Sequence, residues 1–343
     1  SPEIKKEYEI GTDIRFFDNK VKIGYSYFYN TTDDVFFNLS LANSSGYDEI
    51  FTNAGKIENK GMEVDLGYDI FQTEDFKINL TANWSYYRNK VLDLKGVESI
   101  RLGGLSAVSG RAVEGYPLGV FWGTKFSRND DGTIFLNSNG FPTLAPENGV
   151  IGDPHPDWQG GVGTTLTWKN LNLYFLFETY QGADIYAGTK AVLLNYGRHR
   201  DSGVETIAQK DLFDYNGGLI TSGTSFRGIV HDFGAGDVAL TESWYRGIGG
   251  YFSGVQEQFV EDGSWTRLRE VTLSYSLRGP RFKKSTKLSS IDFSLTGRNL
   301  HIWTNFIGND PDTNLTEVST TRGIDYFNNP GTKSYVFKIT LNY

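Results

Sequence analysis

The sequence predicts an all-β protein whose strands form part of an antiparallel transmembrane β-barrel. Aromatic residues make up 15% of the 343 residues, and 40 glycines accompany them, a composition that suits strands and turns. Apolar and polar side chains alternate over strand-length segments, as expected when one face of a strand is apolar. No run of residues approaches the ~18 apolar residues of a membrane-spanning helix, whereas a barrel strand needs only about 9 to 11 residues.

The composition also excludes several classes of protein. The chain has no cysteine, so it has no disulfide framework, no thiolate zinc site and no cysteine nucleophile. The abundance of aromatic residues argues against disorder for most of the chain. The formal net charge is −8, which argues against a nucleic-acid partner because such partners normally bind a basic face.

Four strands are expected in the first quarter of the chain. The alternating segments there are 7–16, 21–30, 62–68 and 76–86. In the last of them Ile78, Leu80 and Trp84 fall on one face, and mostly polar residues occupy the positions between them.

The rest of the chain supplies five further strands and one less regular one. The five are expected at 162–168, 171–181, 267–277, 291–296 and 334–343, and the less regular strand at 120–126. The final strand places only apolar and aromatic side chains on one face, which are Tyr335, Phe337, Ile339, Leu341 and Tyr343. Its ten-residue length and the aromatic residues at both ends of that face are typical of a membrane barrel strand.

The connections between strands are of two kinds. Residues 18–20 and 169–170 form tight turns, whereas 91–118, 127–159 and 183–265 are long segments rich in Gly, Asn, Asp and Ser. Short turns on one rim and long loops on the other are the asymmetry of an outer-membrane barrel. Only residues 204–213 have a helical period of useful length.

No catalytic, metal or cofactor site is expected. The four histidines, His155, His199, His231 and His301, have no ligand spacing, and the chain lacks a Gly-x-Ser-x-Gly nucleophile elbow. The segment from Asn129 to Gly132 resembles part of a calcium loop but lacks the distal Glu, so it is read as a turn. The neighbouring carboxylates Asp33–Asp34 and Glu261–Asp262 are read as polar loops.

Aromatic residues outside the clear strands are the candidates for substrate contact. They are Trp122, Trp158, Tyr186, Tyr196, Trp244 and Tyr245. Three uses remain open for each ring: stacking on the face of a sugar, membership of a membrane-interface girdle, or packing of a long loop.

Three segments carry a family resemblance. They are Asn53-Ala-Gly-Lys-Ile-Glu-Asn-Lys-Gly-Met-Glu-Val, Ile151-Gly-Asp-Pro-His-Pro-Asp-Trp and Ser264-Trp-Thr-Arg-Leu-Arg-Glu-Val-Thr-Leu-Ser-Tyr. With Gly297-Arg-Asn-Leu-His-Ile-Trp and the terminal strand ending on Tyr343, they resemble the C-terminal half of the barrel of SusC/RagA-like TonB-dependent outer-membrane transporters of Bacteroidetes.

The resemblance implies a fold and a set of partners. Residues 1–343 would be the C-terminal portion of a barrel of 22 strands, supplying roughly nine to eleven of them, while the plug domain and the N-terminal strands have no counterpart in the chain. The implied function is active uptake of oligosaccharides or peptides across the cell outer membrane. Its implied partners are a SusD-like surface lipoprotein, the TonB complex acting through the plug, the remaining barrel strands and outer-membrane lipid.

The resemblance also gives roles to particular positions. The last strand, through Tyr343, would be the signal for barrel assembly. Polar positions of the strands would face a wet lumen, and these are Glu63, Asp65, Lys77, Asn79 and Lys338.

Two other functions are weighed against the alternation of apolar and polar residues along the strands. A soluble all-β glycan-binding module would pack its apolar strand faces against each other instead of against lipid. An outer-membrane enzyme is disfavoured, because no nucleophile and base stand at a recognisable spacing.

Overall fold

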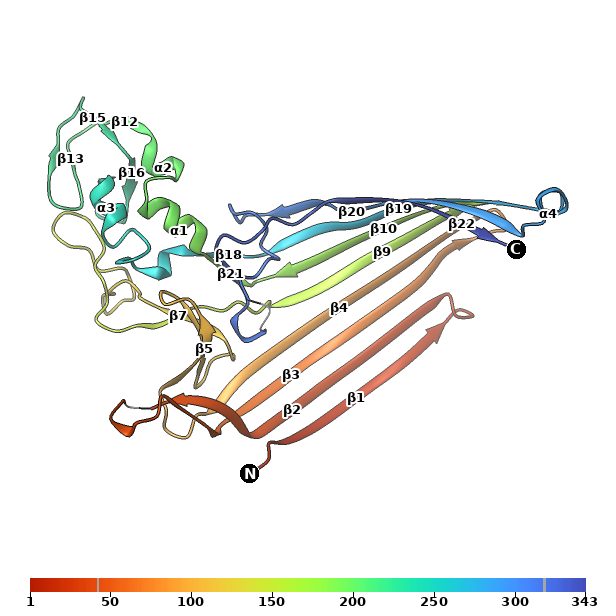
Figure 1. Ribbon diagram of the computed structural model, residues 1–343, viewed down its shortest axis with the longest axis horizontal. Coiled ribbons are helices and arrows are strands. Elements are labelled where there is room, and N and C mark those ends of the chain that lie inside the picture. The colour runs from red at the N-terminus through yellow and green to blue at the C-terminus, as the bar shows by residue number, and fades with distance from the viewer. Residues whose placement is uncertain (42, 317–318) are drawn as a thin grey trace.

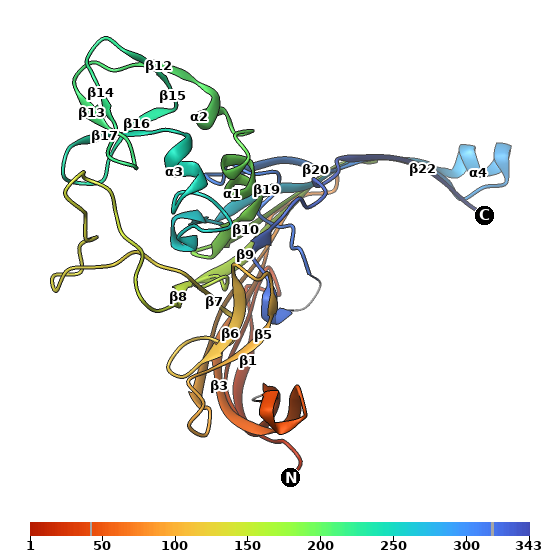
Figure 2. The same cartoon turned by 60° about the vertical axis from the view of Figure 1, so that its left-hand side comes forward.

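The structure, a computed structural model, describes residues 1–41, 43–316 and 319–343. Within these ranges, nine long strands form one antiparallel sheet in the order β1-β2-β3-β4-β9-β10-β19-β20-β22 (Figure 1). Their bounds are β1 Ile4–Phe16, β2 Val21–Ser40, β3 Glu49–Gln72, β4 Phe76–Asp93, β9 Trp158–Trp168, β10 Leu171–Gln181, β19 Trp265–Arg278, β20 Ser290–Thr304 and β22 Ser334–Asn342. The sheet bends strongly but does not close, so β1 and β22 are its two edges (Figure 2).

Tight turns join the strands at one end of the sheet. Phe17, Asp18 and Asn19 all have left-handed backbone angles between β1 and β2, and the Lys20 N–H donates to the Phe17 carbonyl at 3.2 Å. Lys169 has a φ of 55° in the turn between β9 and β10. Positive φ values of this kind give short hairpin turns the twist of the strands that they connect. The β19–β20 turn is longer and contains the short helix α4, Pro280–Thr286.

The nine strands of the large sheet confirm the nine regular strands predicted from alternation, but β2 and β3 are longer than expected. Both continue through polar residues that hide the alternation, including Asn30–Asp34 on β2 and Asn53–Lys60 on β3. The pairing between them is irregular near Val35, and Asp34 has a φ of 57° there. These extensions carry β2 and β3 past the apolar band toward the side of the long connections (Figure 1).

The three long connections are structured rather than irregular. A four-stranded sheet contains β5 (Ser99–Gly104), β6 (Ser109–Val113), β7 (Val120–Gly123) and β8 (Gly149–Gly152). A second small sheet joins β11 (Asp184–Ala187), β18 (Val260–Asp262) and β21 (Ile324–Asp325). The less regular strand predicted at 120–126 is therefore shorter, as β7, and lies outside the large sheet.

Three two-stranded antiparallel sheets and several short helices complete this side of the molecule. The sheets pair β12 (Glu205–Ile207) with β15 (Ser225–Arg227), β13 (Leu212–Phe213) with β14 (Leu219–Ile220), and β16 (Ile229–Asp232) with β17 (Asp237–Leu240). The helices are α1 Gly188–Asn195, α2 Arg200–Gly203, α3 Glu242–Arg246, η1 Asn43–Ser45, η2 Gln256–Phe259 and η3 Ser319–Thr321. The helix predicted at 204–213 is wrong, because β12 and β13 occupy these residues and find backbone partners in β15 and β14.

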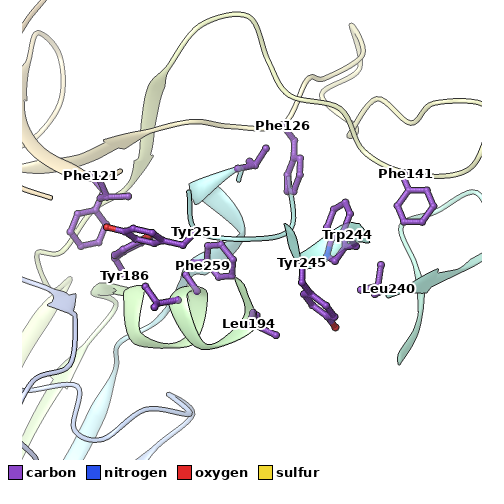
Figure 3. Close-up of a cluster of buried hydrophobic side chains, with 14 of the residues drawn as sticks. Phe121, Phe126, Phe141, Tyr186, Leu194, Leu240, Trp244, Tyr245, Tyr251 and Phe259 are labelled. Carbon is purple, nitrogen blue, oxygen red and sulfur yellow. The ribbon is translucent and has the colours of Figure 1, made fainter. Parts of the chain in front are cut away.

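The main hydrophobic core lies in this loop-side region, not against the large sheet. Figure 3 shows its aromatic centre, where Phe141 packs against Trp244 with ring centroids 5.7 Å apart. Tyr186, fully buried, donates its hydroxyl to Gln256 Oε1 at 2.5 Å. The long connections thus fold into a packed unit that we call the loop cap, residues 94–157 and 182–263 together with β21.

No helix within the described residues is long and apolar enough to cross a membrane.

Candidate functional site: the polar wall and the loop cap

The two faces of the large sheet differ in chemistry. One face exposes apolar side chains, such as Leu273 and Tyr275 on β19 and Leu295 on β20. The terminal strand exposes all five residues of the predicted apolar face, including Tyr335 and Phe337. Folded proteins rarely leave such an extended apolar surface to water, so this face is built for an apolar surrounding.

Aromatic side chains stand at both ends of the apolar face. Phe177 on β10 and Trp303 on β20 stack across the intervening strand β19 near the loop cap, with centroids 6.2 Å apart. Trp168 and Phe16 are exposed at the end with the tight turns. Two aromatic belts of this kind mark the two interfaces of a membrane barrel.

The opposite face is hollow and polar, and we call it the polar wall. Two open hollows of about 470 and 640 Å³ lie along it and share Asp65, Asn83 and Gly161. Glu63 and Asp65 line these hollows, as predicted. Lys77 and Asn79 lie on the same face of β4 as Thr81, which lines the 470 Å³ hollow. Lys338 is on this face as well, since it pairs with Ser294 on β20.

Close packing explains the glycine at position 61, in the motif that runs from Asn53 to Val64. The ring of Phe28 crosses over Gly61, so that a Cβ at Gly61 would lie 2.6 Å from Phe28 Cζ and 2.5 Å from the Tyr86 carbonyl oxygen. Only glycine leaves room for both atoms.

An arginine network lies on the polar wall near the loop cap. Arg269 Nε lies 2.5 Å from Glu178 Oε2 on β10, and its Nη2 lies 3.3 Å from Asp312 Oδ2 in the segment after β20. Its Nη1 donates to Asn299 Oδ1 at 3.0 Å. An irregularity in the β19 ladder between Leu268 and Glu270 sets Arg269 between two strands and this segment.

A second arginine is buried next to this network. Arg267 Nη2 lies 2.5 Å from Asp310 Oδ1, and both side chains are less than a tenth exposed. The guanidinium also lies over the Trp265 ring at 5.3 Å, while Arg267 Nε has no hydrogen-bond partner among the residues that the structure describes. This pair therefore anchors the segment around residue 310 to β19.

Aromatic stacking and a third arginine connect the wall to the loop cap. Tyr180 and Trp265 stack with centroids 5.9 Å apart at an angle of 11°. Arg322 Nη1 donates to the Tyr180 hydroxyl at 3.2 Å, and that is its one hydrogen bond among the described residues. Arg322 borders the 640 Å³ hollow and a smaller one of about 290 Å³ lined by His155 and Gln159.

Sequence reasoning did not single out these three arginines. The signal was present in the segment Trp265-Thr-Arg267-Leu-Arg269, where Trp and Arg occur at every second position and so share one face of a strand. Arg322 follows a segment without alternation, so its place beside Tyr180 is a result of tertiary folding alone.

The six aromatic candidates have different surroundings. Tyr186, Trp244 and Tyr245 are buried in the core of the loop cap, so their rings serve packing, which was one of the three uses left open. Trp122 is half-buried under the Arg111 guanidinium, 5.2 Å from its ring. Trp158 has the strand parity of Val162 and Trp168, and it also lines the 290 Å³ hollow beside Arg322. Tyr196 is mostly exposed. Substrate contact by any of these residues stays a prediction.

The charged motifs singled out from the sequence, Asp33–Asp34 on β2 and Glu261 in the loop cap, form ion pairs within the protein. Asp33 pairs with Lys56 at 2.9 Å, Asp34 with Lys95 at 2.7 Å, and Glu261 with Lys190 at 2.5 Å. Among the described residues, no three His, Asp or Glu side chains gather as a metal site would require.

The segment from Asn129 to Gly132 forms a turn. The Asp131 carboxylate accepts hydrogen bonds from the Thr133 N–H at 2.9 Å and the Thr133 hydroxyl at 2.6 Å. These hydrogen bonds favour the ionised form and lower the pKa of Asp131.

Burial has the opposite effect on two other carboxyl groups of the loop cap. It raises the pKa of Asp184, whose Oδ2 accepts from the Asp153 N–H at 2.7 Å, and the nearby Asp153 carboxylate adds to the rise. Burial also raises the pKa of Asp325 on β21. Both groups lie where the cap joins the large sheet.

Comparison with known families gives a match over residues 1–189. The matching model is described as TonB dependent receptor-like, beta-barrel, and these residues are more than half of the chain.

Individual relatives are more distant and much longer. TonB-dependent receptor P3 of Formosa agariphila is 24% identical over 99% of this chain, which corresponds to 34% of that protein. TonB-dependent receptor SusC of Bacteroides thetaiotaomicron is 23% identical over 79% of this chain and 26% of its own length. The chain thus spans about one third or less of the curated relatives that it matches.

Among solved structures, the RagAB peptide transporter superposes with a TM-score of 0.70 and 19% identity. The superposition covers 99% of this chain and 35% of that one. At this identity the match shows a shared fold, that of a TonB-dependent β-barrel left open in this chain.

Proposed function

The chain belongs to the TonB-dependent receptor-like β-barrel family, and from this membership we propose that it forms the C-terminal part of the wall of an active transporter for oligosaccharides or peptides. The family consists of outer-membrane β-barrels, so the outer membrane is the location of this chain. The family and the relatives named above are receptors and transporters, not enzymes.

The observation that carries the proposal is the contrast between the two faces of one sheet. Leu273, Tyr275 and Leu277 are exposed on the apolar face, while Thr272 and Ser274, at the alternate positions of the same strand, face the polar wall. The Thr272 hydroxyl forms a hydrogen bond with the Thr296 hydroxyl at 2.8 Å across that wall. A wall that is apolar outside and polar inside separates lipid from an aqueous lumen.

The open edges of the sheet support the proposal that other strands complete the barrel. β1 pairs with β2 and β22 pairs with β20, and each has one edge without a strand partner in the described residues. Within lipid, each unpaired backbone group would cost several kcal/mol, and closure of the barrel removes this cost. We therefore assign residues 1–343 to the C-terminal portion of a larger barrel that also holds a plug.

The partners follow from the family resemblance. A SusD-like lipoprotein would sit on the loop cap, and the TonB complex would supply energy through the plug. The RagAB relative is a peptide transporter, and the relative from Bacteroides carries the name SusC. Peptide and oligosaccharide therefore both remain in the proposal.

Uptake by cells tests the function. Cells that express the full-length protein should accumulate a labelled oligosaccharide or peptide, and a protonophore should abolish the accumulation. Arg269→Ala, which removes the contacts of β19 with Glu178 and Asp312, should lower uptake severalfold, while Arg278→Ala at the turn rim should not.

Two results would refute the proposal. One is accumulation that does not depend on the protein or on the proton gradient. The other is partition of the intact protein into the aqueous phase without detergent, which would favour a soluble glycan-binding module.

A further inference from the structure

The turn between β19 and β20 carries a dense positive charge. Residues 278–288, which we call the basic turn, contain five cations and no acid, although the formal net charge of the chain is −8. The cations are Arg278, Arg281, Lys283, Lys284 and Lys287. A positive charge of this density attracts an anionic partner, and the position of the turn relative to the apolar face indicates which one.

The five cations have no counter-charge within the protein. All five are exposed, and none forms an ion pair among the described residues. Arg278 Nε donates to the neutral Asn170 Oδ1 at 3.2 Å. Elsewhere on the same rim a cation does meet an acid, since Lys169 Nζ lies 3.8 Å from Asp75 Oδ2. The cations of the basic turn therefore repel one another and remain available to an anion from outside.

A short helix holds these cations in place. In α4, the Lys283 N–H donates to the Gly279 carbonyl at 3.0 Å, and the Lys287 N–H donates to the Lys283 carbonyl at 2.9 Å. Pro280 begins the helix, a position that its fixed backbone angle suits. Figure 1 shows α4 projecting past the ends of the strands, on the opposite side of the sheet from the loop cap. The basic turn is thus a folded group of cations and not a flexible tail.

The register of the sheet gives the level of the turn relative to the apolar face. Tyr275 on β19 pairs with Leu171 on β10, which pairs with Trp168 on β9. Tyr275 therefore belongs to the aromatic belt that contains the exposed Trp168. Arg278 follows three residues later, about 10 Å along the strand.

This distance places the start of the basic turn among the lipid headgroups. A strand tilted by about 45° advances ~7 Å along the membrane normal over a length of about 10 Å. The headgroup layer on each side of the hydrocarbon core is about 5 to 8 Å thick. Arg278 therefore reaches this layer, and α4 follows directly.

We propose that the basic turn binds the phosphate headgroups of anionic phospholipids, in the leaflet on the side of the tight turns. Lysine and arginine side chains donate charge-assisted hydrogen bonds to phosphate oxygens. Clusters of four to eight such residues beside a membrane are typical of binding to anionic lipid. The turn continues from Tyr275 and Leu277 on the apolar face, so one lipid can place its acyl chains on that face and its headgroup at the turn. The proposal goes beyond the transport function and does not depend on the substrate.

The lipid selectivity of the purified full-length protein tests this proposal. The protein is equilibrated in mixed micelles with equal amounts of phosphatidylglycerol and phosphatidylcholine that carry the same acyl chains. Lipid that stays bound after free micelles are removed is then quantified by mass spectrometry. Each cation near a lipid surface favours anionic lipid by about fivefold, so the unmodified protein should retain roughly tenfold more phosphatidylglycerol at low salt. The preference should fall in about 0.5 M NaCl, because salt screens exposed charges.

A triple variant of the basic turn tests whether these cations cause the selectivity. The variant combines Lys283→Gln, Lys284→Gln and Lys287→Gln, and it should retain the two lipids in nearly equal amounts. All three side chains are exposed, so the barrel should keep its heat-modifiable mobility. Inorganic phosphate should not displace phosphatidylglycerol from the unmodified protein, because a free anion lacks the acyl chains that hold the headgroup at the turn.

A second triple variant is matched to the first in charge. It combines Arg198→Gln, Arg227→Gln and Arg246→Gln, which removes three exposed cations from the loop cap. These positions lie at the opposite end of the molecule from α4, near α2, β15 and α3 (Figure 1). This variant should keep the preference for phosphatidylglycerol.

Four results would overturn the proposal. They are equal retention of the two lipids by the unmodified protein, an undiminished preference in the variant of the basic turn, an equally large loss in the loop-cap variant, or displacement of the lipid by inorganic phosphate. Uptake measurements separate this proposal from the transport function. A protein that selects phosphatidylglycerol through the basic turn but does not accumulate labelled ligand would refute the transport function alone.

Discussion

Breaking the buried ion pair between Arg267 and Asp310 should release the segment that follows β20. Asp310→Ala removes the carboxylate 2.5 Å from Arg267 Nη2 and leaves a guanidinium that is 6% exposed with only the more distant Asp312 carboxylate, at 3.9 Å, as its ion-pair partner among the described residues. The same carboxylate also accepts the Asp312 N–H at 3.0 Å, so the turn at 310–313 loses a hydrogen bond as well.

The expected magnitude follows from the burial of the pair. Removing one partner of a buried ion pair costs about 3–5 kcal/mol, because the remaining charge stays away from water without compensation. Each 1.4 kcal/mol is a factor of ten, so local opening should become about 10² to 10³ times more frequent. Asp312 Oδ2 lies 3.9 Å from Arg267 Nη2 and compensates part of the lost charge, so we expect the effect at the lower end of this range.

Hydrogen exchange measured by mass spectrometry on the full-length protein checks this prediction. Amides of residues 305–316 should lose protection in Asp310→Ala, while amides of β9 should keep theirs. A double variant, Arg267→Met with Asp310→Leu, should recover most of the protection, because replacing both charges with apolar groups of similar volume is close to neutral. Unchanged protection in Asp310→Ala, or a double variant as open as the single one, would refute the reasoning.

Three further perturbations test other parts of the structure. Deleting Tyr343 should lower insertion into the outer membrane while expression is unchanged, and an unchanged amount of heat-modifiable barrel in membranes would contradict the role of the terminal strand in assembly. Leu273→Arg should destabilise the barrel by about 2–4 kcal/mol, the cost of an arginine that faces lipid near the bilayer midplane. The neighbouring Ser274→Arg, on the polar wall, should be tolerated. Equal losses of stability for the two variants in urea unfolding would contradict the assignment of one face to lipid and the other to the lumen. Because burial raises the pKa of Asp184, its contribution to stability is complete below its ordinary pKa of 3.8 and is lost as pH rises through the raised value. Asp184→Asn keeps an acceptor for the Asp153 N–H, so it should remove this pH-dependent loss of stability and make the loop cap more stable at neutral pH. The pH dependence of hydrogen exchange in β11 measures this effect. If that pH dependence is the same in the variant, Asp184 is ionised in the folded protein at no cost in stability, and the prediction fails.

Alternation predicted the large sheet well because the sheet has one apolar face. The tight turns at 18–20 and 169–170, the strands on either side of them and the polar wall residues Glu63 and Asp65 all follow from a period of two. Alternation fails for the outer parts of β2 and β3, where Asn and Asp occupy both parities. There, Phe37, Ala54 and Ile57 pack into a local hydrophobic cluster with residues of the loop cap instead of facing a continuous apolar surrounding.

The loop cap was beyond this kind of prediction. Its strands are two to six residues long, too short to show a period, and its core joins residues distant in sequence, such as Phe141 and Trp244. The same limit applies to the polar wall, since Asp310 and Asp312, which bind Arg267 and Arg269, lie 43 residues further along the chain in a segment without alternation. Aromatic residues could be recognised as important, but their burial depends on folding of the whole cap.

Solvent mapping along β19 tests the assignment of the two faces to lipid and lumen. The chain has no cysteine, so single cysteines at residues 272–277 of the full-length protein can carry a fluorescent label one at a time. In bilayers, labels at 273, 275 and 277 should be quenched by brominated lipid, and labels at 272, 274 and 276 by aqueous iodide. Quenching without this two-residue alternation, or with the two faces exchanged, would contradict the assignment of this sheet to the wall of an outer-membrane transporter.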